Sequence, residues 1–281
     1  MIGASKFPSS TNQRVLDAVL LLRAYWLWTG VALVCAVVFF SSPGGYNGTA
    51  HALLHGLCAQ TPSHTLMIGG EALPFDARMT GIYGGFLVTV ATIAARGRLF
   101  WYGNPPIRVS ILLGALVGLM AVDGLNSLLT DLGMWHPYRP HNALRVVTGC
   151  GAGVALAVVL GWLVASSVWR LSAPRPAMGK IQDLAAPVVG FGGFGVILLA
   201  RPYWLHFPVS MLLVVSAWIA VTMLVLVIAL LAFRLDSKIL TLRQLHVPVA
   251  ISALAAISVM LALAGGRYWL EHTFGLSNAM M

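Results

Sequence analysis

Seven apolar segments, each long enough to cross a lipid bilayer at about 20 residues, set the limits on what this chain can fold into. Such segments must be helical, because hydrocarbon offers no hydrogen-bond partner to an open backbone. A β-barrel is excluded, because barrel strands are short and alternate in hydropathy. The segments run from Ala24 to Phe40, Met79 to Ala95, Ile107 to Leu129, Ala143 to Val168, Leu184 to Ala200, Phe207 to Phe233 and Val247 to Gly265.

The sequence therefore predicts an all-α, polytopic membrane protein with seven transmembrane helices, forming a single integral membrane domain over residues 1–281. Charged residues make up only 9% of the chain and hydrophobic residues 59%. An ordinary soluble domain has roughly 25% charged residues. This composition excludes a soluble enzyme, a disordered chain and a disulfide scaffold.

The basic residues predict the orientation of the chain. Three lie in the N-terminal arm, and three more in each of the second, fourth and sixth loops, whereas the opposite side holds five. The side with more Lys and Arg is normally cytoplasmic, so the N-terminus is predicted inside and the C-terminus outside, in the plasma membrane of a prokaryote. The net charge of +9 thus reflects topology, and nucleic acid is not expected as a partner.

Seven of the eight histidines fall on the predicted outer side. Residues 1–23 are interpreted as a cytoplasmic arm with an amphipathic lead-in, and residues 41–78 as a long outer loop that lies on the surface or re-enters the membrane. Within that loop, His51 and His55 are one helical turn apart, a spacing that suits a metal or haem ligand pair. An interfacial position for the two imidazoles is the alternative. Cys58 is the one cysteine expected to meet solvent.

The third apolar segment carries its polar residues on one helical face, namely Asp123, Asn126, Ser127, Thr130 and Asp131. An ionisable residue inside a span marks either a site or an ion pair. Asp123 lies about 24 Å along the helix from Ile107, in the predicted outer leaflet. Arg145 is its expected counter-ion, and Arg78 is the second candidate. A functional site and a structural ion pair are both open interpretations.

Glycine pairs spaced four residues apart occur in three of the predicted helices: Gly81 with Gly85, Gly114 with Gly118, and Gly149 with Gly153. Such pairs allow two helices to approach closely. We expect them to serve packing rather than a ligand route.

The stretch LCAQTPSHTLMIGGEALPFDARMTGIYGGF, residues 57–86, resembles the signature of a prokaryotic family of predicted membrane proteins, the domain-of-unknown-function 2085 family. That signature begins with Cys-His-Gln, continues with a Pro-x-Arg-Ser step, and ends with Cys-x-Arg-Cys and Gly-Ile-Tyr-x-Gly. Later elements around Asp123 and at 141–149 (HNALRVVTG) resemble the family's Asp-Gly and Asn-x-x-Arg-x-x-x-Gly patterns. The resemblance covers roughly residues 50–160 and implies a membrane protein without a settled activity.

The chain departs from this signature mainly at its cysteines. Cys58, Gln60 and Arg78 match, but Ala59 replaces the histidine, His64 stands at the arginine, and Asp76 and Met79 stand at the two later cysteines. Polar and glycine positions are retained: Gly81, Ile82, Tyr83, Gly85, Asp123, Asn142, Arg145 and Gly149. This favours binding or structure over thiol chemistry.

Three functions are compatible with these patterns. The favoured one is a non-enzymatic protein that binds or passes a small solute, ion or lipid headgroup through a polar vestibule of the outer leaflet, lined by Arg78, Tyr83, Asp123, Asn126 and Arg145. The second is an accessory subunit of a larger membrane complex, with a metal, haem or pigment at the outer histidines. The third is an enzyme acting on a lipid phosphate through His136, Arg139 and His141, although no complete set of nucleophile, base and orienting residue is present.

Overall fold

The computed structural model describes residues 25–37, 39, 44–168, 175–234 and 242–275. In this part of the chain, six helices are long and apolar enough to cross a membrane. They are α3 (Ala77–Ala95), α4 (Ile107–Asp131), α5 (Asn142–Val168), α6 (Ala185–Ala200, preceded by the short helix η2, Ile181–Leu184), α7 (His206–Ala232) and α8 (Leu242–Phe274). The predicted polytopic helical fold is confirmed.

The first predicted span, Ala24 to Phe40, falls partly outside the described residues. Within it the structure has an apolar helix, Tyr25–Val37. Thirteen helical residues extend about 20 Å, which is less than the hydrocarbon thickness of about 30 Å. A seventh span therefore stays a prediction. The predicted cytoplasmic arm and lead-in, residues 1–23, also lie outside the described part.

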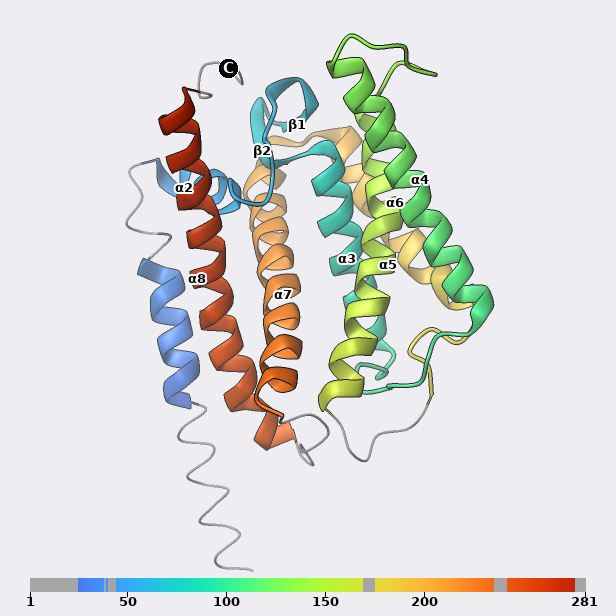
Figure 1. Cartoon of the computed structure of the whole chain (residues 1–281), viewed down its shortest axis with the longest axis vertical. Coiled ribbons are helices and arrows are strands. Elements are labelled where there is room, and N and C mark those ends of the chain that lie inside the picture. Colours follow the sequence, from blue (N-terminus) through green and yellow to red (C-terminus); the bar gives the residue numbers. More distant parts are fainter. Residues whose placement is uncertain (1–24, 38, 40–43, 169–174, 235–241, 276–281) are drawn as a thin grey trace, which may run out of the picture.

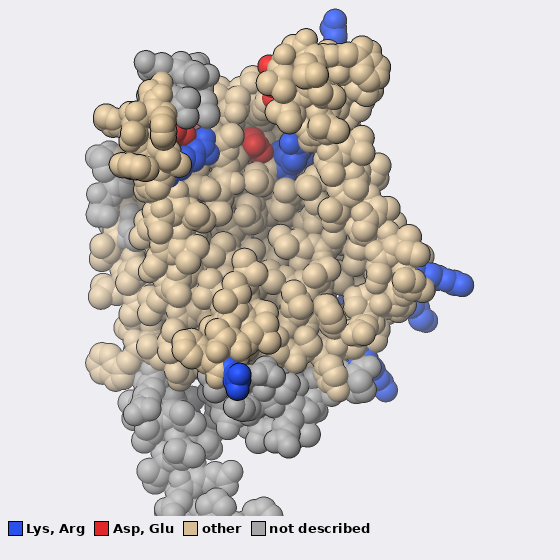
Figure 2. Space-filling view, viewed as in Figure 1, with Lys and Arg blue, Asp and Glu red and all other residues tan. Residues whose placement is uncertain are grey.

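Successive long helices alternate in direction along the vertical axis of Figure 1. One end of the bundle carries α2 and the strands β1 and β2, and we call it the cap end; we call the other the basic end. On the face shown in Figure 2, acidic and basic atoms lie together near the cap end, whereas the charges visible near the basic end are Lys or Arg. This distribution agrees with the prediction that most Lys and Arg residues lie on one side of the membrane. That the basic end faces the cytoplasm stays a prediction.

The most extensive helix pair in the bundle is α3 with α5, and glycine makes it possible. A Cβ built on Gly153 would lie 2.1 Å from the carbonyl oxygen of Ile82, and one on Gly149 would lie 2.3 Å from that of Arg78. On the facing helix, a Cβ on Gly81 would lie 2.2 Å from the carbonyl oxygen of Val146. The predicted packing role of the glycine pairs in these two helices is confirmed.

The third glycine pair behaves differently. A Cβ on Gly114 or on Gly118, both in α4, meets no other atom within 4 Å. The packing role predicted for this pair is therefore wrong among the described residues. The physical reason is that α4 is peripheral and presents this face to open space instead of to a neighbouring helix.

Residues 44–76, which we call the cap, form local structure between the first apolar segment and α3. Helix α2 (Gly45–Leu54) is followed by a short helix η1 (Pro62–His64) and an antiparallel hairpin of β1 (Thr65–Ile68) and β2 (Glu71–Asp76). The hairpin turns at Gly69 and Gly70, whose φ angles are +59° and +88°. Two positive φ angles are what a tight two-residue turn requires, and glycine adopts them without strain.

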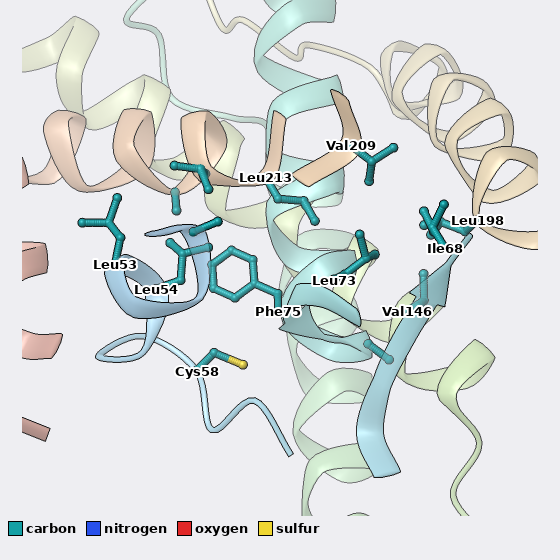
Figure 3. Close-up of a cluster of buried hydrophobic side chains, with 14 of the residues drawn as sticks. Leu53, Leu54, Cys58, Ile68, Leu73, Phe75, Val146, Leu198, Val209 and Leu213 are labelled. Atoms are coloured by element: carbon teal, nitrogen blue, oxygen red, sulfur yellow. The ribbon is translucent and has the colours of Figure 1, made fainter. Parts of the chain in front are cut away.

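The cap is packed onto the ends of the long helices. Figure 3 shows Leu53 and Leu54 of α2, Ile68 of β1 and Leu73 and Phe75 of β2 meeting side chains of α5, α6 and α7 in one buried cluster. Four of these side chains, Leu54, Ile68, Leu73 and Phe75, have no exposed surface. This contact fixes β2, and therefore the start of α3 directly after it, relative to the bundle.

Candidate functional site

The first turn of α3 places an arginine between the cap and α4. The carboxylate of Asp76 accepts a hydrogen bond from the backbone N–H of Met79 at 2.8 Å and so caps the helix. Arg78 follows within that turn, beside the face of α4 that carries Asp123 and Ser127. Those two residues are four positions apart on α4, so their side chains lie one above the other.

Asp123 and Arg78 form a buried ion pair. The Nη2 atom of Arg78 lies 2.9 Å from Oδ2 of Asp123 and also donates to Oγ of Ser127 at 3.1 Å. The carboxylate side chain is 2% exposed and the arginine side chain 25%. Two hydroxyls complete the carboxylate's shell, because Tyr138 donates to Oδ1 at 2.9 Å and Thr148 to Oδ2 at 3.4 Å. The desolvated charge is therefore paired and hydrogen-bonded, as burial requires.

Arg145, in the first turn of α5, reaches the same serine from the other side. Its Nε atom donates to Oγ of Ser127 at 3.4 Å, its Nη1 to Oδ1 of Asn142 at 2.8 Å and its Nη2 to Nε2 of His64 at 3.2 Å. The counter-ion expected first from the sequence was Arg145, but the structure pairs Asp123 with Arg78. We call the side chains joined by these contacts the polar network: His64, Arg78, Asp123, Ser127, Tyr138, Asn142, Arg145 and Thr148.

His64 connects the network to the cap, and its contact with Arg145 indicates its protonation state. An arginine has no acceptor, so the Nε2 atom of His64 must accept and the imidazole is neutral. Burial first, and then the charge of Arg145, lower the pKa of His64 below its ordinary value of 6.5. Asp131 lies 3.6 Å from the same Nε2 atom. Protonated His64 would donate to Asp131 and could no longer accept from Arg145.

Asn126 has a positioning role beside the network. Its amide donates to the backbone oxygen of Tyr138 at 2.9 Å, and the N–H of Tyr138 donates back to its Oδ1 atom at 3.5 Å. This pair of bonds holds the segment between α4 and α5 so that the phenol reaches Asp123. Burial and the hydrogen bond to Asp123 raise the pKa of Tyr138 above its ordinary range, so the phenol remains the donor.

Tyr83 lies away from the other predicted vestibule residues. Its ring stacks on Phe75 of β2, with centroids 4.7 Å apart and an interplanar angle of 12°. Its backbone oxygen accepts a hydrogen bond from Ser216 of α7 at 2.6 Å. The structure therefore brings Arg78, Asp123, Asn126 and Arg145 together and places Tyr83 in the apolar contact between α3 and the cap.

His51 and His55, the predicted metal pair, each contact other groups of the cap end. His51 Nε2 is 3.3 Å from the backbone oxygen of Ala72. The two ring nitrogens of His55 are 3.0 Å from Oε1 of Gln60 and 2.8 Å from Oε2 of Glu271 in α8. Within the described residues, no group of three or more His, Cys, Asp or Glu side chains could hold a metal ion.

Cys58 does not meet solvent as the sequence suggested, because the cap folds over it. The residue is 4% exposed, and its sulfur accepts backbone hydrogen bonds from Gln60 and Asp76, each at 3.4 Å. Burial raises the pKa of the thiol to about 12. A thiolate is the reactive form of cysteine, so this side chain serves packing in the folded protein.

Other outer-side residues considered from the sequence lie apart from the network. His141 and Arg139 are exposed, and Nδ1 of His136 is 3.1 Å from the backbone oxygen of Met134. Tyr138, in the same loop, was missed as a site residue although it makes the closest hydroxyl contact to Asp123. Its signal in the sequence was position alone: an aromatic hydroxyl in the short connection between the Asp123 helix and the Arg145 helix.

Comparison with known proteins identifies one segment of the chain. Residues 58–159 match the family model described as "Predicted membrane protein (DUF2085)". The resemblance inferred from the sequence is confirmed over this segment, which contains every residue of the polar network. No curated protein and no solved structure matches the chain.

Proposed function

We propose that this membrane protein, whose DUF2085 segment carries the polar network, binds an oxyanion at that network, on the outer leaflet of a prokaryotic plasma membrane. The oxyanion is either a small solute that the protein holds or passes, or the phosphate of a lipid headgroup. The role is one of binding rather than catalysis. Residues 58–159 supply the binding groups, and the remaining helices supply the membrane scaffold.

One observation carries this proposal: two guanidinium groups converge on a single serine hydroxyl, and in the described part of the chain only one of them, that of Arg78, forms an ion pair with a carboxylate. Arg78 and Arg145 both donate to Ser127, but Asp123 is paired with Arg78. In the described part of the chain, the hydrogen-bond partners of Arg145 are Ser127, Asn142 and His64. None of these carries a negative charge while His64 is neutral. Asp131, Asp123 and Asp76 act on Arg145 through their charge but accept no hydrogen bond from it in the described part of the chain, so an oxyanion would supply a charged acceptor.

The local hydrogen bonding of Arg78 supports the same conclusion. Its Nε atom is buried and has no partner among the described residues, although its side chain as a whole is a quarter exposed. A buried donor without a partner costs about 1–3 kcal/mol. A planar oxyanion or phosphate beside the guanidinium would accept from this N–H and lower that cost.

The test is calorimetric titration of the protein in lipid nanodiscs, with inorganic phosphate in one arm and a short-chain phosphatidic acid in the other. Arg145→Gln should weaken binding of the preferred probe roughly tenfold or more, the loss expected for one charge-assisted hydrogen bond. Arg139→Gln, an exposed arginine at the same end, is the matched control and should bind like wild type. Binding that survives Arg145→Gln unchanged, or that Arg139→Gln weakens equally, would refute the proposal.

The proposed site also predicts a pH dependence, because His64 gains a proton only below its lowered pKa. The charged groups acting on it are Arg145, Asp131, Asp76 and Arg78. Protonation adds a positive charge and releases one N–H of Arg145, so binding of sulfate, whose own charge is constant here, should strengthen as pH falls through this lowered pKa. In His64→Gln this increase should vanish, whereas His51→Gln should retain it. A sulfate affinity equally pH-dependent in wild type and His64→Gln would contradict the assigned role of His64.

A further inference from the structure

A groove between α4 and α5 opens at the basic end, on the opposite side of the membrane from the polar network. Its volume is about 590 Å³. Its inner part is apolar and includes Gly114, Val117, Ala155 and Val159. A Cβ at Gly114 would meet no other atom of the described residues within 4 Å. The groove is thus a consequence of the α4 glycine that does not pack.

The mouth of this groove is polar. Asn104, Ser110 and Trp162 line it, and all three lie near the basic ends of their segments. The indole Nε1 atom of Trp162 is buried and has no hydrogen-bond partner in the described part of the chain. An unpaired buried N–H is costly, and a ligand with an ester or phosphate oxygen at this depth would accept from it. The lining therefore changes from polar to apolar towards the membrane interior, in the same order as the polar head and apolar chain of an amphiphile.

A second hollow, about 400 Å³ in volume, flanks the start of α4 on its other side. Pro105 borders the groove and Pro106 borders this hollow, so consecutive residues just before α4 line the two spaces. Two exposed basic side chains, Arg108 and Lys180, line the hollow.

The nearest acidic group in the sequence is already bound. Asp183 lies 3.1 Å from Nη1 of Arg96 and 3.0 Å from Nη1 of Arg98. Its side chain also accepts the backbone N–H groups of Gly179 and Lys180, each at 3.0 Å. Asp183 therefore lies beside the hollow, but its ion pairs in the described part of the chain are with Arg96 and Arg98, and none joins it to the side chains of Arg108 or Lys180.

We infer that these two spaces together bind one anionic glycerophospholipid of the leaflet at the basic end. Its phosphate lies between Arg108 and Lys180, its glycerol region crosses the proline pair near Trp162, and one acyl chain follows α4 over Gly114. The lining of the two spaces matches the parts of such a lipid in order. Basic side chains face the phosphate, hydrogen-bond donors face the glycerol region, and apolar residues face the acyl chain. Juxtamembrane basic residues select anionic over zwitterionic lipid on the same electrostatic grounds.

Native mass spectrometry of the full chain released from nanodiscs tests this inference. The nanodiscs contain an equal mixture of phosphatidylglycerol and phosphatidylcholine, and the readout is the ratio of the two lipids retained. The Arg108→Gln/Lys180→Gln double variant should lower the retained phosphatidylglycerol ratio roughly tenfold. Gly114→Leu should lower total retained lipid, because the leucine fills the acyl channel. Both changes lie in exposed or open positions, so the variants should fold.

The chain offers a matched control for each variant. Gly118→Leu places the same side chain in open space one turn further along α4, and Arg175→Gln removes an exposed charge at the same end; neither residue lines the two spaces. Both controls should retain lipid like wild type. The inference fails if Gly114→Leu and the double variant also retain lipid like wild type, or if the controls lose it equally. It also fails if Gly114→Leu converts a dimer into a monomer without changing lipid, since the groove would then hold a second copy of the chain.

Discussion

Gly153→Ala is expected to lower the apparent free energy of unfolding by about 2–3 kcal/mol, although it adds a single methyl group. The new Cβ would lie 2.1 Å from the carbonyl oxygen of Ile82 and 2.8 Å from the backbone nitrogen of Phe86. Both are backbone atoms of a helix, so relief requires α3 and α5 to move apart. The expected value is a net one, since alanine by itself favours a helix over glycine by about 1 kcal/mol.

Separation of these helices would spread along their whole contact. Gly149 faces the carbonyl oxygen of Arg78, and Gly81 faces that of Val146, at similarly short distances. Because Arg78 belongs to this contact, the polar network would lose its geometry as well. The measurement is thermal or denaturant unfolding in a mild detergent, followed by circular dichroism and by the fraction of monodisperse protein.

Gly161→Ala is the matched control, because it lies on the same helix and a Cβ there meets no atom of the described part of the chain within 4 Å. This variant should be as stable as wild type, or more stable by up to about 1 kcal/mol through helix propensity. The two alanine variants should therefore change stability in opposite directions. Equal stability of Gly153→Ala and Gly161→Ala would show that the close approach of α3 and α5 does not limit the fold.

Hydropathy was sufficient to locate the long helices. Helix α4 begins at Ile107 and α5 ends at Val168, as the apolar runs predict. Hydropathy failed at the end of α8. The predicted span ends at Gly265, whereas the helix continues to Phe274. The added turns mix charged and aromatic residues, and they are held by contacts that hydropathy does not register: Arg267 lies 2.7 Å from Glu271, and both bind the cap.

The hairpin of the cap was missed although its turn has a recognisable signal. Gly69 and Gly70 separate two apolar runs, a pattern that favours a tight hairpin. Strands of four and six residues are too short to stand out beside spans of twenty, so the segment was interpreted only as an outer loop. The helical turn expected at His51 and His55 corresponds to α2, which includes His51 and ends at Leu54, next to His55.

The sequence indicated that Asp123 needs an arginine, but the first choice, Arg145, was wrong, because the structure pairs Asp123 with the second candidate, Arg78. Both lie in the first turn of a helix that begins at the same end, so their distance along the axis is similar. The choice depends on how far each helix is rotated about its axis. The glycine contact between α3 and α5 sets that rotation, and hydropathy contains no information about it.

Arg78→Gln is expected to be the most destabilising change within the polar network, at about 3–5 kcal/mol. It leaves a carboxylate that is 2% exposed without its counter-ion, and the remaining hydroxyls of Tyr138 and Thr148 cannot neutralise the charge. Asp123→Asn should cost less, about 1–2 kcal/mol, because the Arg78 side chain is 25% exposed and can gain hydration. Asp131→Asn, half-exposed on the same helix, should change stability by less than about 0.5 kcal/mol.

The double variant Arg78→Gln/Asp123→Asn distinguishes a true ion pair from two independent contacts. If the large cost of Arg78→Gln arises from an unpaired buried charge, removing that charge should restore stability, and the double variant should be more stable than Arg78→Gln alone by about 2 kcal/mol. If the two residues act independently, the double variant should instead be less stable than either single one. In one outcome, the double variant recovers stability without recovering phosphate or phosphatidic acid binding. That result would show that the pair both supports the fold and shapes the anion site. The reason is that neutral side chains can satisfy packing but cannot attract an oxyanion.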